Sequence, residues 1–247
     1  MLIRVLLAAT LAGVAAGVFA TAAQSLRVTP LILQAETYEN AGVPAHSHGE
    51  AATGAHTHDH GEEGWAPADG LGRTFFTLLA NVVVGAGFAL LVTAAVLVTG
   101  WRVTLKNGFA WGLAGFATFV LAPAIGLPPE LPGTVAADLT ARQVWWLATV
   151  VATAGGLGIF AFSWRSGHWQ PLWIIAGVVL LAAPHLYGAP QPHEHESLVP
   201  AHLAVEFVVA SIATGFVYWL FLGGLLGFLL DRAMRAEAKA GHLEAAA

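Results

Sequence analysis

Histidine is the residue type in this 247-residue chain that is best suited to chemistry, because eleven histidines stand among few other polar side chains. Five of them lie within one short segment that also holds glycine, alanine and acidic residues: His46, His48, His56, His58 and His60. Neutral imidazoles at this density can wrap a divalent cation. The segment has too little apolar periodicity to fold alone, so a disordered outer loop is expected. Its composition favours metal capture over a plain polar linker or a pH-responsive loop.

A second histidine group precedes the last apolar stretch. It contains His185, His193, His195 and His202, and Glu206 follows His202 by four residues. Residues four apart share a helix face, so the imidazole of His202 and the carboxylate of Glu206 should point the same way. A carboxylate inside a membrane segment is costly and indicates a functional site, although a glutamate in the headgroup layer could also cap the helix start. We predict that His185, His202 and Glu206 form the site where a metal ion enters the protein.

Asn81 is a further polar residue at membrane depth, near the start of the second apolar stretch. Asparagine in such a position usually hydrogen-bonds to a neighbouring helix; the alternative is a place on an ion pathway. Two glycine pairs, Gly13 with Gly17 and Gly223 with Gly227, have the spacing that lets helices pack closely. We assign packing to these glycines and no chemistry.

Six apolar stretches must position these residues. They run over 5–23, 75–98, 108–127, 144–162, 172–183 and 203–230. A bilayer core of ~30 Å is crossed by about 20 helical residues. Only 10% of the residues are charged, against about 25% in a soluble domain. The sequence therefore predicts an all-α integral membrane protein of about six transmembrane helices. The chain has no cysteine, which excludes disulfides and thiolate metal ligands.

These stretches divide the chain into four parts. We expect a first transmembrane helix over 1–24 and an outer loop rich in histidine and acids over 25–74. A five-helix bundle follows over 75–230, and its outer loop 184–202 carries the second histidine group. A cytoplasmic tail is expected over 231–247. The first helix also resembles a signal peptide, with Arg4 before an apolar run and small residues at 20–22. The run is longer than the usual h-region of roughly 7–15 residues, which favours a retained helix.

The distribution of charge predicts the orientation. If the N-terminus is cytoplasmic, seven of the ten lysines and arginines lie on the cytoplasmic side, in agreement with the positive-inside rule. The same topology places nine of the eleven histidines and eleven of the fifteen acids on the outer side. We expect a multi-pass protein of a bacterial inner membrane, with both termini in the cytoplasm and an outer face that attracts cations.

An internal repeat is suggested by residues that recur at similar spacing. The matched positions are Trp101 with Trp164, Trp111 with Trp173 and Pro123 with Pro184. They indicate repeated helical hairpins, unless tryptophan and proline simply favour these places in any membrane helix. In the returning helices, Asp138 and Arg142 correspond to His202 and Glu206. The first pair predicts an N-cap with an intrahelical ion pair, which the second copy replaces by two potential metal ligands.

Short motifs along the chain carry a family resemblance. They are VTPLI (28–32), AETYE (35–39), DGL (69–71), RT (73–74), LLAN (78–81), LAP (121–123), GLPPELPG (126–133), AADL (136–139), RQ (142–143) and WW (145–146). With the histidine tract, they resemble the CbtA family of predicted cobalt transporters over nearly the whole chain. The resemblance implies a cobalt importer of cobalamin-making bacteria that works beside CbtB, a small single-helix subunit with its own histidines. It also implies five membrane helices, which matches our count of six if the first is cleaved.

The leading functional hypothesis is therefore an uptake transporter for a divalent transition-metal cation, namely cobalt for cobalamin synthesis, with Ni²⁺ or Zn²⁺ as alternatives. No tightly bound cofactor is expected, and the partners are membrane lipid and a CbtB-like subunit, not nucleic acid. The chain has no phosphate-loop, kinase or hydrolase signature, so we do not expect an enzyme.

Two other classes of protein compete with a transporter. A metal-binding sensor or storage protein that does not transport would need no polar path below Glu206, and the sequence offers little polarity there. A haem or copper redox protein would have histidine pairs deep in facing helices. No histidine lies there, which argues against the redox class.

Overall fold

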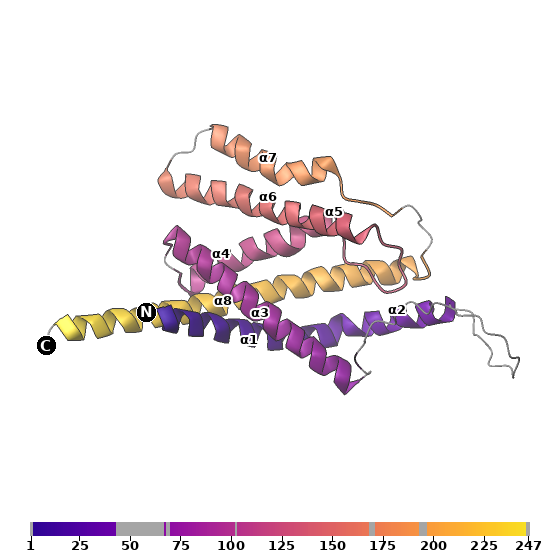
Figure 1. Cartoon of the computed structure of the whole chain (residues 1–247), viewed down its shortest axis with the longest axis horizontal. Coiled ribbons are helices and arrows are strands. Elements are labelled where there is room, and N and C mark those ends of the chain that lie inside the picture. The colour runs from indigo at the N-terminus through magenta and orange to yellow at the C-terminus, as the bar shows by residue number, and fades with distance from the viewer. Residues whose placement is uncertain are drawn as a thin grey trace, which may run out of the picture.

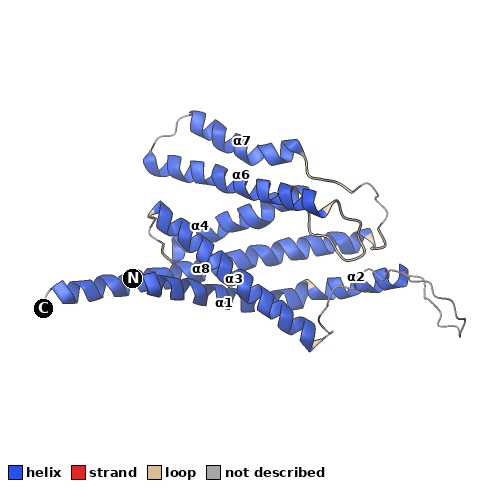
Figure 2. Ribbon diagram, in the orientation of Figure 1, coloured by secondary structure: helices blue, strands red, loops and turns tan. Residues whose placement is uncertain are grey.

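The computed structural model describes residues 2–42, 67, 70–101, 103–167, 171–192 and 197–245. Most of these residues lie in α-helices, with one short π-helical segment, and no strand occurs among them (Figure 2). The elements are α1 (Leu2–Arg27), α2 (Thr29–Gly42), α3 (Leu71–Thr99), α4 (Leu105–Phe116), η1 (Ala117–Leu121), α5 (Ala122–Gly126), α6 (Leu139–Ser166), α7 (Pro171–Tyr187) and α8 (Ala201–Ala245). The predicted all-α fold is confirmed.

Five of these helical segments are long and apolar enough to cross a membrane, and α7 is a shorter apolar helix. The five are α1, α3, the continuous run of α4, η1 and α5, α6 and α8. At 1.5 Å per residue, the 17 residues of α7 extend over about 25 Å, somewhat less than a bilayer core of ~30 Å. About six membrane helices therefore agree with the structure.

Two helices differ from what hydropathy predicts. α2 lies inside the segment 25–74, which was expected to be a loop, and its Ala35 is completely buried against other elements. α8 does not end near residue 230 but continues to Ala245. Its continuation carries an ion pair between Asp231 and Arg235, with 2.8 Å between nitrogen and oxygen. The predicted tail therefore begins as a helix.

The third spanning segment changes its winding halfway. Residues Ala117–Leu121 are π-helical, and Pro123 follows within α5. Proline has no N–H, so it cannot bond the carbonyl four residues earlier in an α-helix. This missing bond provides a local reason for the change in winding. Such π segments are frequent at functional sites.

Glycine allows the central helices to touch along their backbones. A Cβ atom added to Gly13 or Gly17 of α1 would lie 2.5 Å from backbone atoms of α3. Gly223 and Gly227 of α8 pack in the same way on the backbone of α4 and on Thr104 just before it. The predicted packing role of both glycine pairs is confirmed.

Helices α1, α3, α4 and α8 form the centre of the bundle, and α6 and α7 pack on each other beside it (Figure 1). α4 packs mainly on α8, and α7 on α6. The helices of the predicted hairpins are thus not each other's main neighbours, and the repeat stays a prediction.

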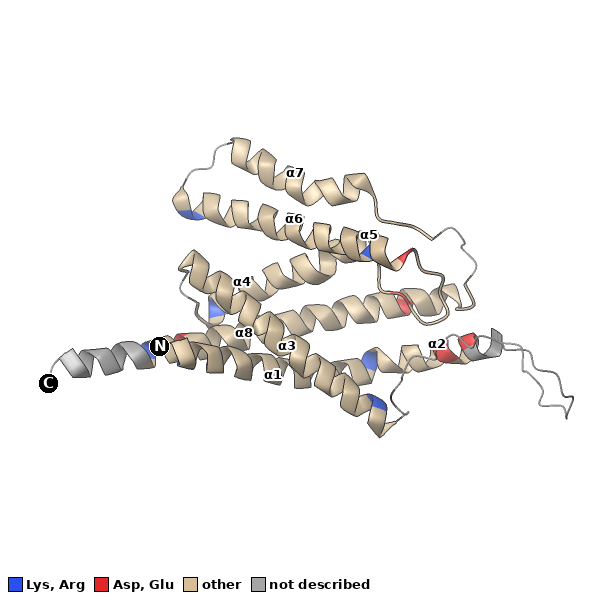
Figure 3. Ribbon diagram, in the orientation of Figure 1, with Lys and Arg blue, Asp and Glu red and all other residues tan. Residues whose placement is uncertain are grey.

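The two ends of the bundle differ in charge (Figure 3). The start of α1 and the end of α8 lie at one end, which we call the terminal end; α2 and the connections 127–138 and 188–192 lie at the other, the α2 end (Figure 1). The charged side chains described at the terminal end are those of the basic residues Arg4, Lys106, Arg165, Arg232 and Arg235 and of one acid, Asp231. The α2 end holds the acids Glu36, Glu39, Glu130, Asp138 and Glu206 with three arginines, Arg27, Arg73 and Arg142.

Candidate functional site

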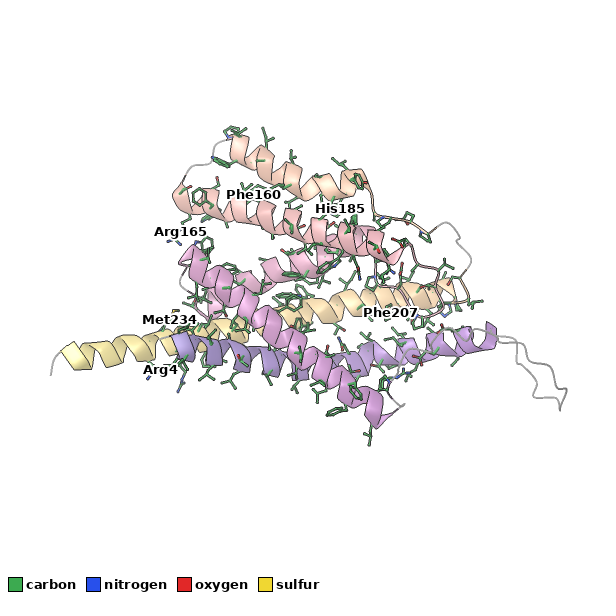
Figure 4. All side chains as sticks on the ribbon, in the orientation of Figure 1. Arg4, Phe160, Arg165, His185, Phe207 and Met234 are labelled. Carbon is green, nitrogen blue, oxygen red and sulfur yellow. The ribbon has the colours of Figure 1, made fainter. Side chains whose placement is uncertain are left out.

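His185 lies near the end of α7 that leads into residues 188–192 (Figure 4). Its ring meets that of Trp145 from α6 edge-on, with 5.9 Å between ring centroids. The indole Nε1 of Trp145 donates a hydrogen bond to the Pro184 carbonyl at 3.2 Å, which holds the two helix ends together. The Nδ1 atom of His185 is buried and has no hydrogen-bond partner among the described residues. One imidazole nitrogen is thus held at the α2 end with its bonding capacity unused.

His202 and Glu206 lie in the first two turns of α8 and are both exposed. The buried residues of these turns are Leu203 and Phe207, so the polar pair lies away from the packed face. Within the described part of the chain, no three histidine or acidic side chains come together as a possible metal site. The structure therefore does not assemble His185 with this pair, and the three-residue entry site stays a prediction.

The remaining predicted ligands are His46, His48, His56, His58, His60, His193 and His195, which lie outside the described residues. The helix ends on either side of both segments, those of α2 and α3 and those of α7 and α8, are at the α2 end (Figure 1).

The ion pair predicted between Asp138 and Arg142 is wrong, although the N-cap is confirmed. The Asp138 carboxylate caps α6 by accepting a hydrogen bond from the Ala141 N–H at 2.8 Å. The Arg142 guanidinium instead contacts the Glu130 carboxylate, with 2.8 Å between nitrogen and oxygen. The Asp138 carboxylate is therefore used to cap α6, and Arg142 contacts the connection that precedes α6.

The Glu130–Arg142 pair borders a cavity of ≈ 480 Å³, which we call the end cavity. Ile32 of α2 and Phe207 of α8 also line it. Phe207 belongs to a buried apolar cluster with Ala35, Leu131, Val199 and Leu203. The end cavity is therefore polar on one side and bounded by packed apolar side chains on the other.

A second cavity, of ≈ 260 Å³, lies between α1, α3, η1 and α8, and we call it the bundle cavity. Five of its lining residues are polar and uncharged: Gln24, Asn81, Ser211, Thr214 and Tyr218. The Asn81 amide donates to Thr21 Oγ1 at 3.0 Å and to Gln24 Oε1 at 2.7 Å. The expected bond from Asn81 to a neighbouring helix is confirmed, and the same residue also lines the cavity.

Two hydroxyl groups on the α8 side of the bundle cavity are unsatisfied. Ser211 Oγ and Tyr218 OH are buried, and neither has a hydrogen-bond partner among the described residues. An unpaired buried polar group costs about 1–3 kcal/mol. Rotation of these side chains toward the cavity that their residues line would let a polar occupant offset that cost.

The polar residues of α8 continue the face that buries Phe207. Phe207, Ser211, Thr214 and Tyr218 follow one another at spacings of four, three and four residues, which places them on one helix face. Phe207 lines the end cavity, and the other three line the bundle cavity. This spacing could have revealed the polar face from the sequence. It is hard to recognise because apolar residues separate the polar positions.

Aromatic side chains form another part of the wall of the bundle cavity. The rings of Phe119 and Trp219 are stacked, with 5.5 Å between centroids, and Phe88 contacts both, with 4.9 Å between centroids in each pair. Phe119 belongs to the π-helical segment η1, and Trp219 is almost completely buried in the central core.

A protein-family model matches nearly the whole chain. The model of the family CbtA, described as a probable cobalt transporter subunit, matches residues 2–231. Comparisons with curated proteins and with solved structures found no match.

Proposed function

Because the chain belongs to the CbtA family of probable cobalt transporter subunits, we propose that it is a membrane uptake transporter for a divalent transition-metal cation, with Co²⁺ as the cargo and Ni²⁺ or Zn²⁺ as chemical alternatives. The observation that carries this proposal is the bundle cavity, which has five polar residues in an otherwise apolar wall and lies between helices that are long enough to span a membrane. A sensor or storage protein needs only surface ligands. A cavity lined by Asn81, Ser211 and Tyr218 inside the bundle favours transport over that alternative.

Capture of the ion is assigned to the α2 end. The two histidine-bearing segments, 43–66 and 193–196, are joined to helices at that end, where the described acids are also concentrated. Imidazole nitrogens bind Co²⁺, Ni²⁺ and Zn²⁺, and nearby carboxylates raise the local cation concentration. The predicted ligands of the loops are His46, His48, His56, His58, His60, His193 and His195.

Entry into the bundle is assigned to His185, His202 and Glu206. His185 has an unused ring nitrogen, while His202 and Glu206 are exposed at the same end of the bundle. Two imidazoles and a carboxylate form a ligand set suited to these borderline metals. Movement of the end of α7 toward the start of α8, or a loop histidine supplied as a further ligand, would complete the site.

The direction of transport follows from the charge of the two ends. The basic terminal end is assigned to the cytoplasm by the positive-inside rule, so the α2 end faces outward from a bacterial inner membrane. A divalent cation that moves to a negative interior gains about 4.6 kcal/mol per 100 mV of membrane potential, twice the value for a single charge. Uptake therefore needs no hydrolytic activity in this chain. Its family description as a subunit implies a protein partner, for which a small single-helix CbtB-like subunit is the candidate.

Reconstitution of the purified full-length chain tests the proposal. Proteoliposomes with a potassium diffusion potential, negative inside, and a lumenal dye quenched by Co²⁺ should show uptake that empty liposomes lack. The rate should rise with the imposed potential. Co²⁺ binding without entry, in the presence and absence of the partner subunit, would instead identify an accessory metal-binding protein.

A further inference from the structure

We infer that the bundle cavity is a membrane-embedded holding site for a divalent cation that keeps most of its hydration shell. Gln24, Asn81, Ser211, Thr214 and Tyr218 are the residues that receive it. The inference rests on the proposed function and deepens it, because it assigns the form in which the ion crosses the bundle.

The chemistry of the lining residues determines that form. Among the described residues that line the bundle cavity, none is a histidine or an acid. Its polar groups are amides and hydroxyls, which are weak ligands for a transition-metal ion but good partners for metal-bound water. An ion in this cavity is therefore recognised through its water molecules rather than by direct coordination.

The size of the cavity agrees with a hydrated ion. Six water molecules occupy roughly 180 Å³ at about 30 Å³ each. The cavity of ≈ 260 Å³ can hold such a shell around a small cation. The cavity extends along α8 from Ser211 to Tyr218, a rise of about 10 Å. This length is of the same order as the diameter of a hydrated cation.

The hydrogen bonds of the cavity leave suitable groups unused. Asn81 uses its amide nitrogen toward Thr21 and Gln24, and its Oδ1 accepts no hydrogen bond from a described residue. Ser211 Oγ and Tyr218 OH are likewise unpaired within the described part of the chain. Oxygen acceptors suit metal-bound water, whose hydrogens point outward from the cation.

Packed apolar residues bound the cavity on two sides. Toward the α2 end, Phe207 lies one helical turn before Ser211 and is buried in its apolar cluster. Toward the terminal end, Trp219 stacks on Phe119, and the core continues through Leu222 and Leu226. A holding site in a transporter must exclude open passage in this way, so that the ion does not leak along its gradient.

Removal of the two unpaired hydroxyls tests the site without breaking a hydrogen bond of the fold. The variant carries Ser211→Ala and Tyr218→Phe, and both substitutions keep the shape of the bundle close to native. A matched control exists in α6, where Thr153 Oγ1 is also buried without a partner among the described residues but does not line the cavity. The full-length proteins are compared in the proteoliposome assay with CoCl₂ alone, and their thermal stability in detergent is recorded.

We expect the initial rate of Co²⁺ entry to fall by about tenfold or more in the double variant, because two polar contacts to the hydrated ion are lost. Thr153→Val should transport at the native rate, and all three proteins should melt at similar temperatures. Native entry rates in the folded double variant, with a working wild type, would overturn this inference alone. Absence of entry in the wild type, with and without the partner subunit, would overturn the proposed function and this inference with it. If the double variant does not fold, the initial rate of Co²⁺ entry in Tyr218→Phe alone tests the inference by the same criterion.

Discussion

Phe207 and Ser211 are one turn apart on α8, yet each lines a different cavity. Phe207 borders the end cavity beside the Glu130–Arg142 pair, and Ser211 borders the bundle cavity. The two residues are separated by a rise of about 6 Å along the helix. Along this face of α8, the residues that line the two cavities are therefore adjacent, with Phe207 on the side of the end cavity.

This relationship predicts that Phe207→Ala makes the protein leaky. Loss of the ring should open a path between the cavities, so that Mg²⁺ enters proteoliposomes along with Co²⁺. The substitution should also lower stability by about 3–5 kcal/mol, the usual effect of removing a buried phenylalanine. Phe207→Leu keeps an apolar plug and is the control, with native selectivity. Equal Mg²⁺ exclusion by the alanine and leucine variants would show that Phe207 is not the barrier.

Glu206 is expected to be essential for uptake and dispensable for folding. Glu206→Gln keeps the size of the side chain and removes its charge, and the residue is exposed. We expect Co²⁺ entry to be abolished while binding by the histidine loops stays near native, as measured by isothermal titration. His202→Ala should act in the same direction. Transport at the native rate by both variants would place the entry site elsewhere.

Deletion of residues 45–61 should weaken capture without unfolding the protein. The segment contains five histidines and little apolar surface, so its loss removes ligands but few packing contacts. Uptake should fall at scarce Co²⁺ and recover when the metal is abundant, with an unchanged melting temperature. Either a lost fold or unchanged uptake at scarce metal would contradict the assigned role.

The two histidine loops should face the same side of the membrane. The chain has no cysteine, so single cysteines at Ser47 and Ser197 can be labelled without background. In intact cells, a membrane-impermeant maleimide should label both, and should label a cysteine at Ala247 only after lysis. Labelling of only one loop would refute the shared outer face.

Close helix packing predicts a contrast between two glycines. Gly17→Ala should destabilise the bundle, since the added methyl group would collide with the backbone of α3. Gly87→Ala in α3 meets nothing within 4 Å and should be neutral or stabilising by up to about 1 kcal/mol, because alanine favours helix over glycine. Thermal unfolding in one detergent compares them, and equal effects would mean that the contact between α1 and α3 is looser than described.

Hydropathy was sufficient to predict the spanning helices, because lipid forces every backbone polar group in a span to bond within the helix. It did not predict α2. That helix is short and carries polar residues, and Ala35 is buried by contacts with distant parts of the chain such as Leu131 and Leu203. The residues of α2 alone do not indicate contacts with segments this distant in the sequence.

The candidate site was predictable only in part for the same reason. The spacing of His202 and Glu206 follows from one helix and needs no tertiary information. The bundle cavity joins Gln24, Asn81 and Ser211 from three helices, and each is a single polar residue in its own apolar stretch. The partner of Arg142 was predicted wrongly, because helical spacing favoured Asp138 and did not reveal that this carboxylate caps the helix.

The glycine contacts of α8 have a mechanical consequence. Where α4 and α8 meet backbone to backbone, and α1 and α3 likewise, sliding within each pair is sterically restricted, and contacts between α1 and α8 join the two pairs. The α6–α7 pair is different, since α6 is joined to the rest largely through η1 and α5. Rocking of this pair, of the kind that exposes a site alternately to each side of a membrane, would pull on η1. The wall formed by Phe119 and Val120 would then be the moving part of the bundle cavity.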